Sequence, residues 1–386
     1  MKIKYYMYAA CLFLGMNLLT ACSDDDAPVT EPTDPTEKPD EGNNGNTEDI
    51  DVSNMTLKEA CKDKFLVGAA ITYDDVKDNP TDFWANEQEV LKKHFNALTA
   101  EGAMKWNKIQ NEKGVYTFDE ADAMVDFAER NGMKMIGHCL IWHTALPDWV
   151  WKNKNGGDVD KQTLLNNMRD HINKVVGRYK GRILGWDVAN EVFNDDGTYR
   201  NSPYYRILGE KYLIEAYKMV KEADPDCELY YNDFQLEFTP KRKAVLRLIG
   251  QLREHGIELD AVGLQAHMWM TTPSVENYDN LFQSFKAMGM KVMITEWDLS
   301  VTSKENDIYP NGLPKDIDAK WNQRMLDFFK VFLKYDEIIT RVATWGVSDS
   351  HSWKNEGCTN YPLLFDRQQN AKPCVEEMMK AALADK

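Results

Sequence analysis

Two apolar segments of the chain each end in a glutamate. Ile183–Glu191 reads ILGWDVANE and precedes the polar loop Asn194–Gly197, and Lys291–Trp297 reads KVMITEW later in the sequence. Each segment predicts a buried strand with a polar carboxyl end, where an unpaired amide or carboxylate would cost on the order of several kcal/mol. Two glutamates that face one cleft can cleave a glycosidic bond, with one as proton donor and the other as nucleophile or base.

Tryptophans are expected at the same strand ends. Trp186, Trp297, Trp345 and Trp353 all fall at the ends of predicted strands or in the loops after them. Flat apolar rings at these positions are suited to stacking on sugar rings. The pattern therefore favours a carbohydrate as the ligand of the cleft.

The rest of the chain alternates apolar runs with amphipathic stretches, which predicts an α/β fold with a parallel sheet and helical crossovers. Eight such units predict a single (β/α)8 TIM barrel, whose chemistry lies at the carboxyl ends of the strands. Strands are expected at Phe65–Ile71, Phe95–Thr99, Lys134–Ile141, Ile183–Val188, Glu228–Tyr231, Ala261–Gln265, Lys291–Thr295 and Arg341–Trp345. Helices are expected at 119–131, 161–179, 204–223, 240–256, 275–289 and 318–335.

The two glutamate segments also resemble a known family. Trp186–Glu191 (WDVANE) and Ile294–Glu296 (ITE) are similar to the two signature stretches of glycoside hydrolase family 10, the mostly xylan-cleaving, retaining endo-glycanases. The resemblance extends over about residues 60 to 375. It implies that Glu296 is the nucleophile, that Glu191 is the general acid/base, and that Asn190 binds the 2-hydroxyl of the −1 sugar. It implies neither a metal nor an organic cofactor.

The resemblance also assigns the sugar-binding positions on the glycone side. Glu101 and Lys105 in the stretch TAEGAMKW match residues that bind sugar hydroxyls, and His138 and Trp142 match the lining of the −1 subsite. The family usually has an amide side chain where Gly102 stands, and often one at the position of Ala145. These two small residues predict an open −2 subsite.

Further positions come from the later strands. Phe234 matches a tyrosine that stacks on the +1 sugar, although a core aromatic is an equally good reading of this residue. Gln265 and His267 match residues that contact the −1 sugar and hold the nucleophile. Trp345 and Trp353 match the aromatic roof of the −1 and −2 subsites.

The amino terminus predicts export. Residues 1–21 form a basic start followed by an apolar run too short to span a bilayer well, which is typical of a signal peptide. The end of this run, LTAC, resembles a lipobox, which predicts lipidation of Cys22 and a membrane anchor. The acidic stretch after it, SDDD, resembles the export tag of surface lipoproteins in Bacteroides-like bacteria, so we expect a lipid-anchored outer-membrane protein at the cell surface.

The segment after the proposed lipid site has a different composition from the rest. Residues 22–51 contain eleven acidic side chains, one lysine and almost no large apolar residue, which predicts a disordered acidic linker. Residues 52–386 are then the catalytic domain, expected to act as a monomer. Of the total formal charge of −16, this part carries −8. A negative domain argues against nucleic acid as a partner, since phosphate binding needs basic surface.

The sequence leaves open two alternative functions and one possible disulfide bridge. The substrate could be another β-glycan or a decorated xylan that enters through the open −2 subsite, or the chain could be a glycan-binding lipoprotein without catalysis. Retention of both glutamates, Asn190, Gln265 and His267 speaks against the second alternative. Among the cysteines, Cys358 and Cys374 could form a disulfide bridge, whereas no metal-type spacing is present.

Overall fold

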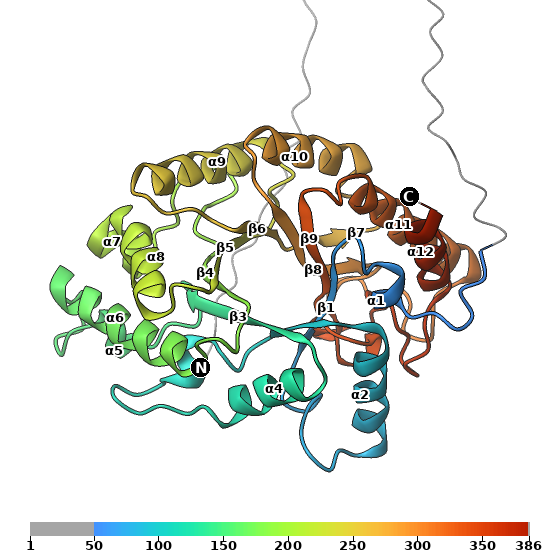
Figure 1. The fold of residues 1–386 in the computed structure, drawn as a ribbon, viewed down its shortest axis with the longest axis horizontal. Helices are drawn as coiled ribbons and strands as arrows, with labels where there is room; N and C mark the ends of the chain where they lie inside the picture. Colours follow the sequence, from blue (N-terminus) through green and yellow to red (C-terminus); the bar gives the residue numbers. More distant parts are fainter. Residues whose placement is uncertain (1–49, 385–386) are drawn as a thin grey trace, which may run out of the picture. The chain divides into compact units, whose positions relative to one another are not determined.

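The structure is a computed structural model that describes residues 50–384. Eight parallel strands are hydrogen-bonded in the order β1-β2-β3-β4-β5-β6-β8-β9, and β9 pairs back to β1, so that the sheet closes into a barrel (Figure 1). A short ninth strand, β7, pairs with the end of β8. The strands are β1 Leu66–Ile71, β2 Ala97–Ala100, β3 Lys134–Ile141, β4 Gly185–Asn190, β5 Glu228–Asp233, β6 Ala261–Leu264, β7 His267–Trp269, β8 Val292–Ser300 and β9 Ile339–Thr344.

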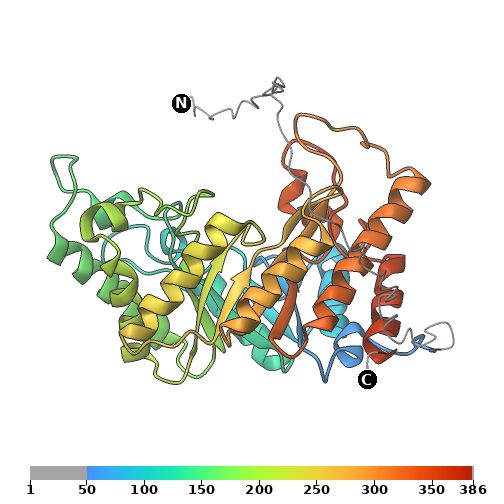
Figure 2. The same cartoon turned by 90° about the horizontal axis from the view of Figure 1, so that it is seen from above.

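Helices cover the outside of the barrel and follow the strands in sequence. Turned by 90°, the barrel shows the long helices running roughly alongside the strands that they cover (Figure 2). The α-helices are α1 Leu57–Ala60, α2 Asp82–His94, α3 Trp106–Ile109, α4 Asp119–Arg130, α5 Asp148–Trp151, α6 Lys161–Arg178, α7 Pro203–Leu208, α8 Lys211–Ala223, α9 Thr239–Glu254, α10 Val275–Ala287, α11 Lys315–Lys334 and α12 Pro373–Ala384. The (β/α)8 barrel expected from the alternating pattern is therefore confirmed.

All eight expected strands are present, with ends shifted by a few residues. One stretch that was expected to form a single helix forms two helices. The stretch predicted as a helix over 204–223 breaks into α7 and α8 at Gly209, whose φ of 65° lies in the left-handed region that glycine adopts without cost. The short strand β7 was not predicted because it has three residues and follows directly on β6 and its turn.

Small residues inside the barrel make room for large ones on neighbouring strands. A Cβ added at Gly185 of β4 would lie 2.4 Å from the ring of Tyr230 on β5, and one added at Gly263 of β6 would lie 2.3 Å from the amide of Asn232. Tyr230 packs with Ile136 and Met293 in an apolar layer across the barrel. Because this layer is filled, it packs beneath the polar side chains nearer the carboxyl ends of the strands and supports them.

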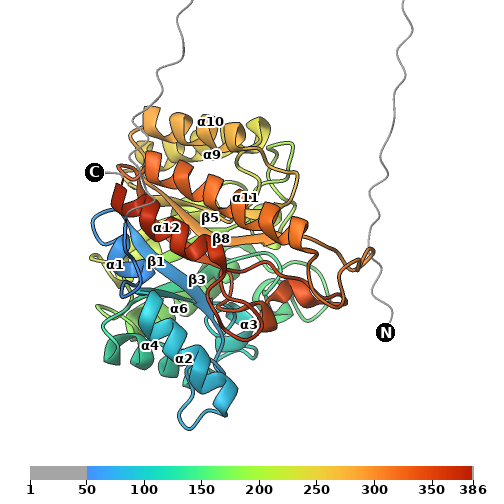
Figure 3. The same cartoon turned by 90° about the vertical axis from the view of Figure 1, so that its right-hand side faces the viewer.

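The carboxyl-terminal helix, α12, packs next to the segment where the described chain begins. α12 lies beside α11 and α1 (Figure 3), and the first described residues join the same core through Ile50 and the buried side chains of Val52 and Leu57. The predicted signal peptide, Cys22 and nearly all of the predicted linker lie outside the described residues. No helix within residues 50–384 has the length and apolar character needed to cross a bilayer.

Candidate active site

A cleft of about 470 Å³ opens among residues at the carboxyl ends of the barrel strands. All twelve cleft residues expected from the sequence line it: Glu101, Lys105, His138, Trp142, Asn190, Glu191, Phe234, Gln265, His267, Glu296, Trp345 and Trp353. Five further residues share the lining, namely Gln235, Glu237, Ala266, Trp269 and Lys354. The barrel therefore gathers into one cavity the side chains that the sequence distributes over the eight strands from β2 to β9 and their loops.

Glu296 lies on β8 and is 4% exposed. One carboxylate oxygen, Oε1, accepts a hydrogen bond from Nδ2 of Asn232 at 2.7 Å, and the other, Oε2, lies 3.1 Å from Nε2 of His267. Two donors on two oxygens fix the plane of the carboxylate, so it cannot rotate away from the cleft.

His267 is held in turn by a buried aspartate. Its Nδ1 lies 2.8 Å from Oδ2 of Asp298, which is fully buried and also accepts a hydrogen bond from the indole N–H of Trp353 at 2.9 Å. Burial disfavours the charged imidazole, but the carboxylates of Asp298 and Glu296 outweigh it and raise the pKa of His267 to about 9. At neutral pH the ring is therefore a cation that donates to both carboxylates.

Glu191 follows β4 and has a φ of 53°, a left-handed conformation that is uncommon outside glycine. Its backbone N–H donates to the carbonyl of Asn232 at 2.9 Å, and its carbonyl accepts from Nε of Arg200 at 3.1 Å. The carboxylate accepts from Gln265 Nε2 at 3.1 Å and from the indole N–H of Trp142 at 3.0 Å. These contacts hold a strained backbone so that the side chain points into the cleft.

The two glutamates are connected by three amide side chains. Oδ1 of Asn190 accepts from Asn232 Nδ2 at 3.0 Å and from Gln265 Nε2 at 3.4 Å, and these same two amides donate to Glu296 and Glu191. Thr295 completes the set, since its hydroxyl donates to Oδ1 of Asn232 at 2.7 Å. Because the carbonyl oxygen of Asn190 is used in this way, its NH2 group is the part available to a ligand.

His138 lies on β3 in the lining of the cleft and is 2% exposed. Its Nδ1 is 2.9 Å from Oδ2 of Asp187, and its ring meets Trp345 edge to face with centroids 5.2 Å apart. Burial alone would lower the pKa of His138, but the contacts with Cys139 and Asp187 raise it to about 10. The ring is thus a fixed hydrogen-bond donor in the lining of the cleft.

Glu101 and Lys105 form the wall next to β2. Burial raises the pKa of Glu101, opposed by the nearby charge of Lys105. Nζ of Lys105 lies 4.8 Å from the ring centroid of Trp142, the same side chain that donates to Glu191. A carboxyl group and an ammonium group here offer an acceptor and a donor to sugar hydroxyls.

Two of the four tryptophans expected to stack on sugar do not reach the cleft. Trp186 is 1% exposed and fills the space that the missing side chain of Gly137 leaves. Trp297 is also 1% exposed and packs against Phe332 of α11. The expectation was wrong for both because their side chains point outward from the barrel, into the layer between strands and helices. Trp345 and Trp353 do line the cleft.

Besides the five further lining residues, three buried residues that support the cleft were not singled out from the sequence: Asp187, Asn232 and Asp298. Each is buried and bonds to a cleft residue rather than lining the cleft itself. Strand alternation carried a signal for one of them, since Asp298 follows Glu296 by two residues on the same strand. Asn232 carried no such signal, because its partner Glu296 is on another strand.

The two small residues of the predicted open −2 subsite, Gly102 and Ala145, have different surroundings in the structure. No heavy atom lies within 4 Å of a Cβ built on Gly102, which follows Glu101 directly. Ala145 is 8% exposed, and neither Ala145 nor Gly102 is among the residues that line the cleft. Open space next to the glycone wall is therefore present at Gly102.

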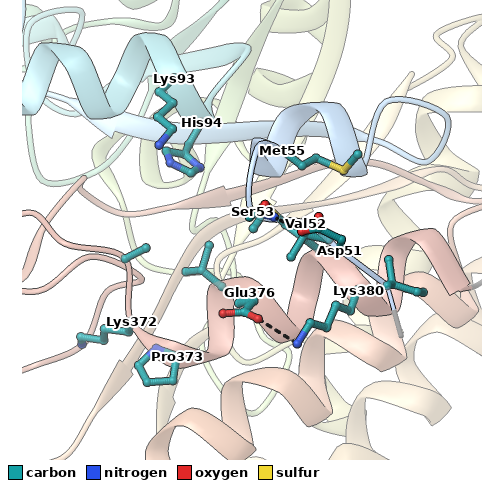
Figure 4. A pocket seen from close by; sticks show the side chains of 14 residues that line it. Asp51, Val52, Ser53, Met55, Lys93, His94, Lys372, Pro373, Glu376 and Lys380 are labelled. Atoms are coloured by element: carbon teal, nitrogen blue, oxygen red, sulfur yellow. Dashed lines mark hydrogen bonds and ion pairs between the residues drawn. The ribbon is translucent and has the colours of Figure 1, made fainter. Parts of the chain in front are cut away.

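Cys358 and Cys374, whose pairing the sequence left undecided, do not form a disulfide. All five cysteines of the described chain are free thiols, including Cys358 and Cys374. A second hollow, of about 530 Å³, lies between residues 50–55, the end of α2 and α12 (Figure 4), and none of the expected site residues lines it. Lys380 in this hollow is paired with Glu376 at 2.8 Å. Within residues 50–384 no group of three or more His, Cys, Asp or Glu residues is arranged to hold a metal ion.

A closed barrel with paired glutamates at the ends of β4 and β8, an amide frame between them and indole walls defines the class of barrel glycoside hydrolases. The sequence profile of "Glycosyl hydrolase family 10" matches residues 56–381. The chain belongs to this family.

Relatives of known activity cover most of the chain. It is 39% identical over 349 residues to endo-1,4-beta-xylanase A of Xylanibacter ruminicola, an alignment that covers 84% of this chain and 93% of the relative. It is 36% identical to a beta-1,4-xylanase of Dictyoglomus thermophilum, with 84% and 90% covered.

Solved structures agree with the fold. The structure of a GH10 endoxylanase from a sugarcane soil metagenome superposes with a TM-score of 0.81 at 36% identity, over 85% of this chain and 99% of that one. A mutant structure in complex with xylotriose superposes with a TM-score of 0.78 at 31% identity, over 84% and 99%.

Proposed function

We propose that the protein is a retaining endo-1,4-β-xylanase that cleaves internal bonds of xylan by double displacement. The observation that carries the proposal is the frame formed by Asn190, Asn232 and Gln265, which orients both glutamates in one cleft. The family membership and the xylanases that align over most of the chain support the same activity.

In the first step Glu296 attacks the anomeric carbon of the sugar in the −1 subsite. The bond from that carbon to the glycosidic oxygen breaks, and Glu191 gives its proton to the departing oxygen. The donors Asn232 and His267 hold Glu296 in the orientation for attack. The NH2 group of Asn190 is placed to bind a hydroxyl of the same sugar, a contact that strengthens as positive charge develops on the ring.

In the second step Glu191 takes a proton from water, and the water oxygen attacks the anomeric carbon. The ester bond to Glu296 then breaks, and the product leaves with its original configuration. Gln265 and Trp142 keep the Glu191 carboxylate in position for both proton transfers. The walls at Glu101, Lys105, Trp345 and Trp353 bind the glycone sugars, and Phe234 supports the sugar on the other side of the cleavage point.

Substitution Glu191→Ala tests the assignment. Turnover of xylan should fall by several orders of magnitude, whereas aryl β-xylobiosides with good leaving groups should react far better because they need little protonation. Added azide should then yield a β-glycosyl azide by attack on the accumulated intermediate. An α-azide, or equal losses on both kinds of substrate, would contradict the roles assigned to the two glutamates.

A second candidate substrate is a decorated xylan, which the open space at Gly102 favours. A branch on the sugar next to Glu101 would meet no side chain at this position. Product profiles on plain xylan, branched xylan and a mixed-linkage β-glucan separate the candidates. A chain that bound all three and cleaved none would instead be a glycan-binding protein.

We further propose that the enzyme is a monomer held at the outer membrane by lipid on Cys22, with residues 22–51 as a spacer. The signal-like start, the LTAC stretch and the acidic composition of the spacer support this location. In cells fed a labelled fatty acid, the wild-type chain should carry the label and sediment with membranes. The Cys22→Ala chain should do neither, and a labelled Cys22→Ala chain would refute the anchor.

A further inference from the structure

Lys241 is a fully buried lysine near the start of α9, close to the cleft. Its Nζ lies 2.9 Å from Oδ1 of Asp233, at the end of β5, and 3.5 Å from Oδ1 of Asp195, in the loop after Glu191. Lysines are almost never fully buried unless they are paired. This one connects the end of β5 to the loop that follows the neighbouring strand β4.

The same ammonium group lies 3.4 Å from the ring centroid of Phe234, and that ring lines the cleft. Oδ1 of Asp233 also accepts from the backbone N–H of Phe234 at 2.9 Å. Both the ring and the backbone of Phe234 are therefore anchored by one ion pair, which leaves the ring with a defined position.

The ion pair also reaches the residues that hold Glu191. Oδ2 of Asp233 accepts from the hydroxyl of Tyr231 at 2.6 Å, and that hydroxyl accepts from the N–H of Val192 at 3.3 Å. The carbonyl of Asp233 accepts from the N–H of Gln265 at 3.0 Å. The position of the ring is thus set relative to the proton donor.

We propose that Lys241 is a positioning residue for the sugar on the leaving-group side of the cleavage point, acting through Phe234. The inference rests on the proposed function. Glu191 protonates the departing oxygen, so the departing sugar lies beyond Glu191, where β5 delivers Phe234. The same sugar site receives an acceptor when the glycosyl-enzyme transfers its sugar to a hydroxyl group instead of to water.

Burial opposes the charge on Asp233 and raises its pKa to about 6, even though Lys241 and Tyr231 lower it. Without the lysine this buried carboxylate would lose its counter-charge and keep only the hydrogen bonds from Tyr231 and Phe234, which would favour protonation or rotation of the side chain. Either change removes an anchor of Phe234. A loss of sugar binding at this ring should follow, separate from any loss of catalytic power.

The chain offers a closely matched control in Lys372. This lysine is 9% exposed, its Nζ lies 2.8 Å from Oδ2 of Asp349 and 3.9 Å from the ring centroid of Trp321, and burial raises the pKa of Asp349 to about 6. Trp321 is fully buried under the barrel helices, and neither it nor Lys372 lines the cleft. Lys372→Met therefore reproduces the loss of a buried ion pair without touching the sugar site.

The test measures how the glycosyl-enzyme partitions between water and a sugar. An aryl β-xylobioside is the donor, since its aryl group departs without a sugar, and xylobiose is added as the acceptor. The ratio of transfer product to hydrolysis product does not depend on the fraction of folded enzyme. In Lys241→Met this ratio should fall about five- to tenfold, whereas Lys241→Arg and Lys372→Met should keep the wild-type ratio.

An unchanged ratio in Lys241→Met, or an equal fall in Lys372→Met, would overturn the inference. If Lys241→Met does not fold, the charge-free pair Lys241→Met with Asp233→Asn provides the same readout. A wild-type enzyme that failed to hydrolyse the aryl xylobioside at all would overturn the proposed function itself, an outcome that the partition ratio distinguishes from failure of Lys241 alone.

Discussion

At the residue scale, each carboxylate of the cleft is held by side chains from other strands. Glu296 on β8 depends on Asn232 from β5 and on His267 from β7. Glu191 after β4 depends on Gln265 and Trp142. Because each donor is itself buried or bonded, loss of a single supporting residue should change the chemistry while leaving the barrel folded.

His267 should give the folded enzyme a specific pH dependence. Its pKa of about 9 in the folded state exceeds the ordinary value of 6.5, so the folded chain keeps a proton that the unfolded chain releases. This stabilisation is complete below about pH 6.5 and is lost as pH rises through about 9. The free energy of unfolding, from urea denaturation between pH 6 and 10, should therefore decline less steeply in His267→Gln than in wild type. The exposed His255→Gln is the control, and parallel curves for wild type and His267→Gln would contradict the charge state assigned to His267.

Gly102 should govern recognition of the glycone next to Glu101. The open space around Gly102 accommodates an asparagine, and its backbone is not in the left-handed region. One added hydrogen bond is worth roughly 0.5–1.5 kcal/mol, so Gly102→Asn should raise kcat/KM on short linear xylo-oligosaccharides by roughly 2- to 13-fold and lower it on branched ones. Gly102→Ala controls for the loss of glycine from the backbone. If Gly102→Asn and Gly102→Ala changed kcat/KM equally, the effect would come from the altered backbone and not from the amide side chain.

At the element scale, the close packing of side chains on neighbouring strands depends on glycine at particular positions. A Cβ at Gly137 of β3 would lie 2.1 Å from the indole of Trp186, which is packed on all sides. Gly137→Ala should therefore reduce the free energy of unfolding by about 1–3 kcal/mol through overpacking. Gly250, inside α9, has no heavy atom within 4 Å of an added Cβ, so Gly250→Ala should instead add about 0.5–1 kcal/mol. Urea denaturation measures both, and a tolerated alanine at 137 would show that Trp186 can move.

The same packing explains which elements could be predicted. Eight strands and the long helices follow from apolar periodicity, which local sequence determines. The direction in which Trp186 points does not follow from it, because bulges shift the register of β4 with both of its neighbours, β3 and β5. Glu296 and Trp297 are neighbours, yet one lines the cleft and the other packs on α11. Because adjacent residues of a strand point to opposite faces, the outward direction of Trp297 follows from the inward direction of Glu296. The direction of Trp186 depends on the register of β4 with its neighbours, and so it was visible only in the structure.

At the scale of the whole molecule, catalysis needs the closed barrel because the site draws on every strand from β2 to β9. The twelve expected cleft residues could be named from motifs, whereas the frame that connects them could not. Asn232, which contacts Asn190 and Glu296 at once, joins three strands, β4, β5 and β8, that are distant in sequence and come together when the sheet assembles. Motif matching finds residues one at a time, and a network of buried hydrogen bonds is a property of the assembled barrel.

The barrel should need the residues from about position 50 onward, but none before them, for its full thermal stability. Val52, Leu57 and Cys61 are 5%, 2% and 0% exposed, and α1 packs against α12. A chain that begins at residue 50 keeps these contacts, so its melting temperature and its kcat/KM on soluble xylo-oligosaccharides should equal those of the full-length enzyme. A chain that begins at residue 62 loses Val52 and Leu57 from the core, at about 1.5–3 kcal/mol for each buried side chain, and should melt at least several degrees lower. Thermal unfolding of both chains is the measurement. A lower melting temperature for the chain that begins at residue 50 would show that residues before it stabilise the barrel.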